Sequence, residues 1–244
     1  MGKFVLLDAR LFTGGADLSG ASNKIEIKAE TEEKDATNYR SQGWKEFLGG
    51  LKSAEVSAGG QWEAGDPGMI DDVAWLQLGG RGAWTVAPTE ATVGAVAYVS
   101  RFLQSDYALG DAVGEVAPWT ATGKSTWPLA RGLIAHAPGT PRTAAGEGQA
   151  VELGQIAARQ RLYAALNVLS VAGSTPTLTV TVESAADEEF TDPAEVLAFA
   201  PATARGGQLI RSTGDAITDA WYRVTWDVTG ADPSFMFVVA LGIA

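Results

Sequence analysis

The most regular feature of the chain is an alternation of apolar and polar residues with a period of two. It runs through residues 24–30, 52–63, 177–183 and 221–228. Because successive side chains of a β-strand point to opposite faces of the sheet, each segment is predicted to be a strand with one face in a core and the other in water. Residues 235–241 are apolar on both faces, which indicates a central strand or one that another layer covers.

Two segments have the spacing of helices. In residues 39–51 the apolar side chains recur at i, i+3, i+4 and i+7, and a Gly-Gly pair follows the main apolar run. We expect the buried face of this helix to consist of Trp44, Phe47, Leu48 and Leu51. A second helix is predicted to begin at Asp66-Pro67, a capping residue followed by proline at the first helical position, and to stop at Gly79.

Residues 161–171 fit either pattern, but a turn-like stretch at 172–176 and a clear strand after it favour a β-hairpin. A similar turn signal occurs at 230–233. Regular turns between short strands predict a mainly β fold, an antiparallel β-sandwich or barrel-forming unit with one or two short helices.

We expect a single unit over residues 1–244. A soft internal boundary is predicted in the loop 135–148, which is rich in Pro, Gly, Thr and Ala and lacks a core pattern. It separates an N-terminal portion, 1–134, from a C-terminal portion, 149–244.

The composition excludes several classes of functional site. The chain has 244 residues, 46% of them hydrophobic, which is enough for a sizeable core. Its 29 acidic and 18 basic residues give a net charge of −11, which argues against a surface that grips nucleic-acid phosphates. With no cysteine and one histidine, thiolate chemistry, disulfides and cysteine zinc sites are excluded. We expect no enzyme activity, cofactor or metal, and neither a targeting segment nor a membrane span.

The candidate chemical sites favour structural interpretations. Asp71-Asp72 and the acidic run 187–189 offer paired carboxylates for acid–base catalysis or calcium binding. The first pair complements a helix N-terminus, however, and the second lies in a predicted loop without the spaced ligands of an EF-hand. Residues 123–125 resemble the end of a phosphate-binding loop but lack the earlier glycine. His136, beside a Pro-Gly turn, is expected to be a surface or loop residue.

The chain contains eight tryptophans, which raises an alternative function. Exposed tryptophans on a β-sandwich can bind sugars, so a carbohydrate-binding or adhesin-like module is the rival interpretation. Trp44, Trp62 and Trp226 fall on predicted apolar faces. The candidates for exposure are Trp84, Trp119, Trp127 and Trp221, of which Trp119 and Trp127 share one segment.

Four stretches follow one another near the start of the chain: the opening residues 12–20, the charged strand 23–30, the acidic segment 31–38 and residues 43–51. Together, and in that order, they resemble the tail tube proteins of long-tailed bacteriophages. The same family is resembled by further stretches, which are residues 110–118, 131–132, 161–168 and 221–223 and the apolar C-terminal segment 234–243. The stretch 23–51 is the most specific part of the resemblance.

The resemblance implies a structural virion protein of the phage tail, made in the host cytoplasm. It implies hexameric rings that stack into a hollow tube, in which inner strands of six subunits close into one β-barrel and genome DNA passes without specific binding. Further implied partners are a tape measure protein and tail terminator or distal tail proteins.

Two sets of residues are assigned roles on this basis. An acidic lumen would repel phosphates, and its candidates on the exposed strand faces are Glu26, Glu30, Glu55 and Glu63. Lys24 and Lys28 share the first of these faces and are expected to form cross-strand or intersubunit ion pairs. The ring-stacking contact is expected in a solvated loop that orders on assembly and contains Thr31, Glu32, Glu33, Lys34 and Asp35.

Overall fold

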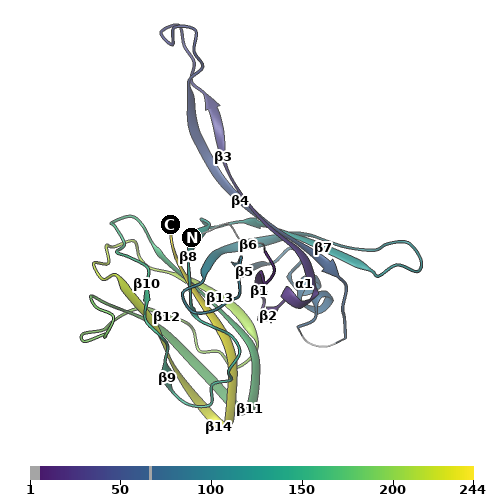
Figure 1. The fold of residues 1–244 in the computed structure, drawn as a ribbon, viewed down its shortest axis with the longest axis vertical. Coiled ribbons are helices and arrows are strands. Elements are labelled where there is room, and N and C mark those ends of the chain that lie inside the picture. The colour runs from purple at the N-terminus through teal and green to yellow at the C-terminus, as the bar shows by residue number, and fades with distance from the viewer. Residues whose placement is uncertain (1–5, 66–67) are drawn as a thin grey trace.

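The computed structural model describes residues 6–65 and 68–244, and nearly all of its regular structure is antiparallel β-sheet (Figure 1). The strands are β1 (Arg10–Thr13), β2 (Ala16–Asp17), β3 (Ser22–Asp35), β4 (Phe47–Gln61), β5 (Arg81–Ala87), β6 (Val96–Leu109), β7 (Pro118–Ser125), β8 (Ala130–His136), β9 (Gly146–Glu147), β10 (Val151–Glu152), β11 (Leu162–Ala185), β12 (Ala194–Ala198), β13 (Gly206–Arg211) and β14 (Trp221–Ile243). The helices are the 3-10 turn η1 (Ser19–Ala21) and α1 (Ile70–Gln77). The mainly β prediction is confirmed.

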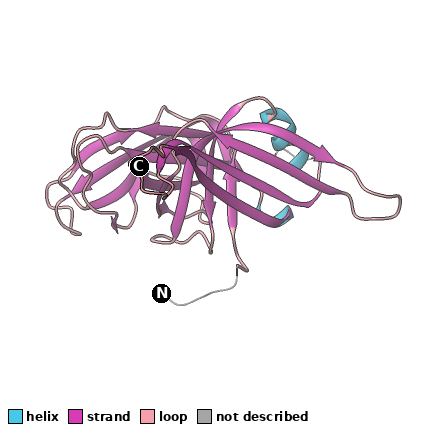
Figure 2. Ribbon diagram, turned by 90° about the horizontal axis from the view of Figure 1, so that it is seen from above, coloured by secondary structure: helices cyan, strands magenta, loops and turns pink. Residues whose placement is uncertain are grey.

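All the strands belong to one hydrogen-bonded network that does not close into a barrel within the described chain. Its main path runs β12-β11-β14-β8-β6-β5-β1-β2, and β7, β4 and β3 branch from β6. Figure 2 shows the result from above, with strands folded over one another and α1 to one side.

The long strands β11 and β14 form the centre of the C-terminal body, and the paired stretches 162–169 and 237–242 are buried on both faces. Phe237 and Leu241 of β14 point into one core cluster, while Val238 and Ala240 point into a second cluster shared with β1, β6 and β8. Two buried faces require apolar residues at every position, which explains the unbroken apolar run 235–241. The prediction of a central, covered strand is confirmed.

The predicted hairpin turn at 172–176 is wrong, because β11 continues through it. The register shifts at this point, where Gly173 and Thr175 have φ values of 108° and 49°. On the facing strand Gly230 and Asp232 have φ values of 125° and 48°, so the two turn-like stretches lie opposite each other. Positive φ values here produce paired bulges that bend both strands without ending them.

Strands β3, β4, β7 and part of β6 form a four-stranded inner sheet. Its apolar side carries Val56, Ala58, Trp119 and Ala121 and is covered by α1, η1 and β1. The strands predicted at 24–30 and 52–63 are confirmed, although β4 ends at Gln61.

The helix predicted at residues 39–51 is absent. Residues 47–51 instead begin β4 and pair with β3, with Phe47 opposite Asp35 and Leu48 opposite Lys34. The four residues expected in its core, Trp44, Phe47, Leu48 and Leu51, are all exposed. A helical apolar face gains stability only where a core can bury it, and this segment projects from the body, where β3 supplies a ladder of backbone hydrogen bonds instead.

The second predicted helix exists as α1. It begins at Ile70, after the N-cap Met69, and buries Ile70, Val73 and Ala74 against the inner sheet. The predicted start at Asp66 and Pro67 lies outside the described residues.

The loop 135–148 follows the edge of β14. Backbone hydrogen bonds of 2.7 and 2.9 Å join Arg142 to Phe235, and β9 pairs with β14 near its other end. A domain boundary in this loop stays a prediction.

Candidate functional site

The inner sheet has one polar face that extends across all four strands. Alternation along each strand places on it the residues Lys24, Glu26, Lys28, Glu30, Ser53, Glu55, Ser57, Asp106, Thr120, Thr122 and Lys124. Three of the predicted lumen residues, Glu26, Glu30 and Glu55, therefore share one surface. The fourth, Glu63, is exposed but lies beyond the end of β4, because the strand is shorter than its alternation suggests.

Ion pairs run along the β3 edge of this face. Lys24 Nζ lies 3.0 Å from Glu26 Oε2, and Lys28 Nζ lies 2.7 Å from Glu30 Oε1. The Glu30 carboxylate raises the pKa of Lys28, and so, to a smaller extent, does Glu55, its partner in the register with β4. With three lysines against four carboxylates, the face carries a net charge of −1. It is a mixed surface rather than a purely acidic one.

Both ends of the inner sheet are open edges. Within the described residues, β3 pairs with β4 alone, so the opposite side of this 14-residue strand has no partner. The other open edge belongs to β6. Strand β5 pairs with β6 only as far as Leu103, and the Gly79-Gly80 segment makes two backbone hydrogen bonds with Gln104. Residues 105–109 then have β7 on one side and no strand on the other.

The β3–β4 hairpin extends far beyond the body as an arm (Figure 1). The stacking residues Thr31, Glu32, Glu33, Lys34 and Asp35, expected in a loop, lie in β3, and the loop is formed by residues 36–46. The segment is a strand because β4 continues opposite it as far as Phe47. Thr37 donates hydrogen bonds to Asp35 and lowers the pKa of that carboxyl at the start of the loop.

The arm carries exposed apolar side chains on a charged strand pair. Trp44 is 80% exposed and Leu51 82%, and Tyr39, Phe47 and Leu48 are exposed as well. Five large apolar residues at one extremity form a surface of the kind that proteins use for contacts with other proteins.

Asp71, the first residue of the acidic pair at the start of α1, has a structural role. Asp71 Oδ1 accepts hydrogen bonds from the Tyr107 hydroxyl at 2.6 Å and from Trp62 Nε1 at 3.1 Å. Burial and this carboxylate raise the pKa of Tyr107 to about 12. The network fixes the N-terminus of α1 to β6 and to the end of β4.

Two predictions about single side chains are wrong. His136, expected at the surface, is 3% exposed and lies in the body against Phe237 and Trp226. Trp119, a candidate for sugar binding, is 1% exposed and donates from Nε1 to the Ala21 carbonyl at 3.1 Å. In both cases the alternation of β8 or β7 turns the side chain into a core, which local turn signals did not reveal.

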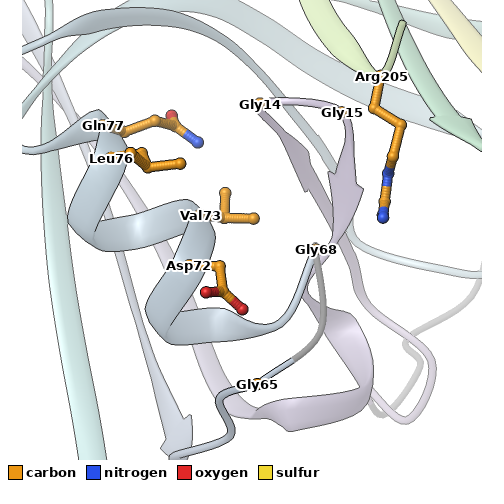
Figure 3. A pocket seen from close by; sticks show the side chains of 9 residues that line it. All are labelled: Gly14, Gly15, Gly65, Gly68, Asp72, Val73, Leu76, Gln77 and Arg205. Carbon is orange, nitrogen blue, oxygen red and sulfur yellow. The ribbon is translucent and has the colours of Figure 1, made fainter.

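A pocket of about 400 Å³ separates α1 from the β1–β2 turn (Figure 3). Val73 and Gln77 of the helix face it from one side, and Gly14, Gly15 and Arg205 from the other. Gly14 has a φ of 58°, and a Cβ there would lie 2.3 Å from Gln77 Nε2. The glycine turn therefore leaves room for the Gln77 side chain at the C-terminal end of α1.

Among residues 6–65 and 68–244, no group of three or more His, Asp or Glu side chains is arranged to hold a metal ion. The acidic run 187–189 lies in the loop between β11 and β12, as predicted. Over the same part of the chain, no helix has the length and apolar character needed to span a membrane.

Comparison with known proteins finds no matching family model and no matching curated protein. Among solved structures, a chain of the virion of a native gene transfer agent particle matches at a TM-score of 0.41 and 20% identity, over 50% of this chain and 94% of that one. A chain from the C6-symmetric tail of an empty gene transfer agent particle matches at 0.37 and 21% identity, over 45% and 80%.

The SPP1 Dit protein, described as a hub of the adsorption apparatus in phages infecting Gram-positive bacteria, matches at a TM-score of 0.32 and 10% identity. This match covers 97% of this chain and 99% of that one. Because all three TM-scores lie below 0.5, the geometry of the inner sheet and its arm is the basis for assigning a function.

Proposed function

We propose that this chain is a structural virion protein, the subunit of a phage tail tube. Six copies, the number that the family resemblance implies, form a ring, and rings stack into a hollow conduit for genome DNA ejection. The observation that carries this proposal is the four-stranded inner sheet, which has one polar face and two open edges.

The strand directions favour closure between copies. Each neighbouring pair in the series β3-β4-β7-β6 is antiparallel, so β6 runs opposite to β3. An even number of alternating strands allows β6 of one copy to pair antiparallel with β3 of the next. A ring closed in this way removes both edges, which would otherwise invite uncontrolled aggregation.

The polar face supports a lining for DNA. The two lysines of β3 on this face are each paired with a glutamate of the same strand, Lys24 with Glu26 and Lys28 with Glu30. These cations are partly neutralised, and the face as a whole is slightly negative. A surface of this kind offers little affinity for phosphates, because such affinity comes mainly from unpaired basic groups. We assign Glu26, Glu30 and Glu55 to the lumen, and Glu63 to its rim.

The arm supplies the ring-to-ring contact in this proposal. Its loop holds the exposed Trp44, and Leu51 is exposed farther along β4; a neighbouring ring would cover both. Thr31, Glu32, Glu33, Lys34 and Asp35 form the β3 half of the arm. By the family resemblance, the other partners are a tape measure protein and tail terminator or distal tail proteins, and the place of action is the phage tail after synthesis in the host cytoplasm.

Disulfide trapping tests the edge contact, because the natural chain has no cysteine. Lys28→Cys on β3 is combined with Ala108→Cys on β6, and Glu26→Cys and Glu30→Cys sample neighbouring registers. Within one chain the two edges are three strand spacings apart, roughly 14 Å, which is too far for a disulfide. We expect a non-reducing gel to show a ladder of covalent oligomers that ends at a hexamer, and negative-stain microscopy to show rings.

The control combines Lys28→Cys with Asp227→Cys, an exposed position of β14 in the C-terminal body. It is expected to give no ladder. Absence of cross-links from all three edge pairs, together with absence of rings from the natural chain at high concentration, would refute the tube proposal.

Shortening the arm tests the stacking contact. Residues 36–46 are replaced by Asn-Gly, which suits a two-residue hairpin turn because Asp35 and Phe47 are register partners. We expect single rings in place of tubes. Tubes of normal length from this variant would show that the arm tip does not join rings.

A further inference from the structure

The outer side of α1 carries an apolar surface that the fold of one chain does not use. Trp75 is 64% exposed, Leu76 82% and Leu78 41%, while the inner side of the helix is buried. The Trp75 ring meets Tyr107 edge-on at 6.4 Å between centroids. We call Trp75, Leu76 and Leu78 the helix knob.

The helix knob lies beside the open edge of β6. Gly79 N donates to the Gln104 carbonyl at 3.0 Å, and Gln104 N donates to the Gly80 carbonyl at 3.1 Å. Residues 105–109, which pair with β7 on one side and have no strand on the other, begin at the next residue. The knob therefore stands on the apolar side of the inner sheet, next to the edge that a neighbouring strand would occupy.

An apolar groove of about 330 Å³ lies at the opposite edge of the inner sheet. Its first wall is the apolar side of β3 and its second wall is formed by β5, β6 and the segment after β7. Ile25, Ile27 and Ala29 line the first wall, and Val86, Pro88, Tyr98 and Leu129 line the second. Leu6 and Ala9 of the N-terminal segment also line the groove. Ile25 and Ile27 stay half-buried in the single chain, and Ala29 is exposed.

We propose that the helix knob of one copy docks into this groove of the next copy. The inference rests on the proposed function, since it takes the β6–β3 junction as its starting point. When β3 of a second copy continues the sheet beyond β6, the polar faces align. Ile25, Ile27 and Ala29 of that copy then fall on the side where α1 stands.

The occupant is a second copy because knob and groove lie on the same side of the sheet, at its two complementary open edges. Burial of an exposed tryptophan at the centre of such a contact makes it a hot-spot candidate. Lateral contact would thus use two layers: backbone pairing of the strands, and the helix against the groove behind them.

Cross-linking between two single-cysteine chains tests the contact directly. A Trp75→Cys chain is mixed with an Ala29→Cys chain under oxidising conditions. A disulfide between the two variants gives a heterodimer, and a disulfide between two copies of one variant gives a homodimer. We expect heterodimer in large excess over the homodimer of either chain. An Asp227→Cys chain mixed with the Ala29→Cys chain is the control and is expected to give none. Equal yields from the two mixtures would overturn the proposal.

Ring formation provides the second measurement. Trp75→Ser is expected to raise the concentration needed for rings about thirtyfold, the effect of losing a hot-spot side chain. Val113→Ser, at an exposed apolar residue in the loop between β6 and β7, is the control and should leave ring formation unchanged. Urea unfolding of both variants verifies that the single chains fold like the natural one.

The two proposals fail in different ways. If the natural chain forms rings and Trp75→Ser forms them equally well, the knob contact is wrong and the tube proposal stands. If the natural chain forms no rings and none of the three edge pairs cross-links, the tube proposal fails, and the mixed-chain disulfide alone decides whether knob and groove meet.

Discussion

Protonation of His136 is expected to destabilise the fold. The imidazole stacks on Phe237 at 4.1 Å between centroids and meets Trp226 edge-on at 5.0 Å. Its Nδ1 lies 3.1 Å from the Phe237 carbonyl oxygen, which can only accept, so Nδ1 donates. Arg142 Nε donates to His136 Nε2 at 3.3 Å. The bond from Arg142 requires the neutral imidazole, because a proton on Nε2 would point at a guanidinium that is itself a donor, whereas the Nδ1 bond persists in the protonated ring.

The pKa of His136 determines the size and the sign of the change in the free energy of unfolding with pH. Burial, and then the Arg142 charge, lower the pKa of His136 from 6.5 to about 4. Between these values the unfolded chain binds a proton that the folded chain does not, so unfolding becomes easier as the pH falls. A difference of roughly 2.5 pKa units at 1.36 kcal/mol each is about 3 kcal/mol. This contribution is fully present above pH 6.5 and is lost as the pH falls toward 4.

The assay uses the unassembled chain. His136 is the only histidine, so its imidazole resonances in an NMR titration report this one pKa directly. Urea unfolding from pH 7.5 to pH 4 is compared with that of His136→Gln, which keeps polar groups but does not titrate. The free-energy difference between the two proteins is expected to shrink by about 3 kcal/mol over this range. An imidazole that titrates near 6.5 in the folded chain, or equal pH dependence of both proteins, would refute the reasoning.

The remaining predictions concern packing. Trp119→Ala removes a buried indole and its hydrogen bond, and should lower the free energy of unfolding by about 3–5 kcal/mol in urea titrations. A soluble, fully stable variant would contradict this placement. Gly132→Ala would bring a Cβ to 1.9 Å from the Leu241 carbonyl oxygen, so we expect a loss of about 3 kcal/mol. Gly20→Ala, where nothing lies within 4 Å of the new Cβ, is its control and should change stability by less than about 0.5 kcal/mol.

The sequence determined which face is buried in the strands whose apolar and polar residues alternate clearly. Alternation marked Ile25 and Ile27 against Glu26, and the apolar run at 235–241 marked a strand covered on both sides. This information is local, because burial of one face imposes a period of two on the strand itself. The mainly β class and the candidate polar face follow from it directly.

Only the tertiary structure decided what each segment pairs with. The spacing of Trp44 and Leu51 fits a helix, yet β3 lies opposite and the arm offers no core, so the segment is part of a hairpin. The glycines at 173 and 230 resemble turns, yet they face each other as bulges between two long strands. Partner choice depends on contacts between distant residues, which local periodicity does not contain. The charge of −11 is a property of the sequence, whereas the near-neutral, ion-paired polar face between two open edges exists only after folding brings β3, β4, β7 and β6 together.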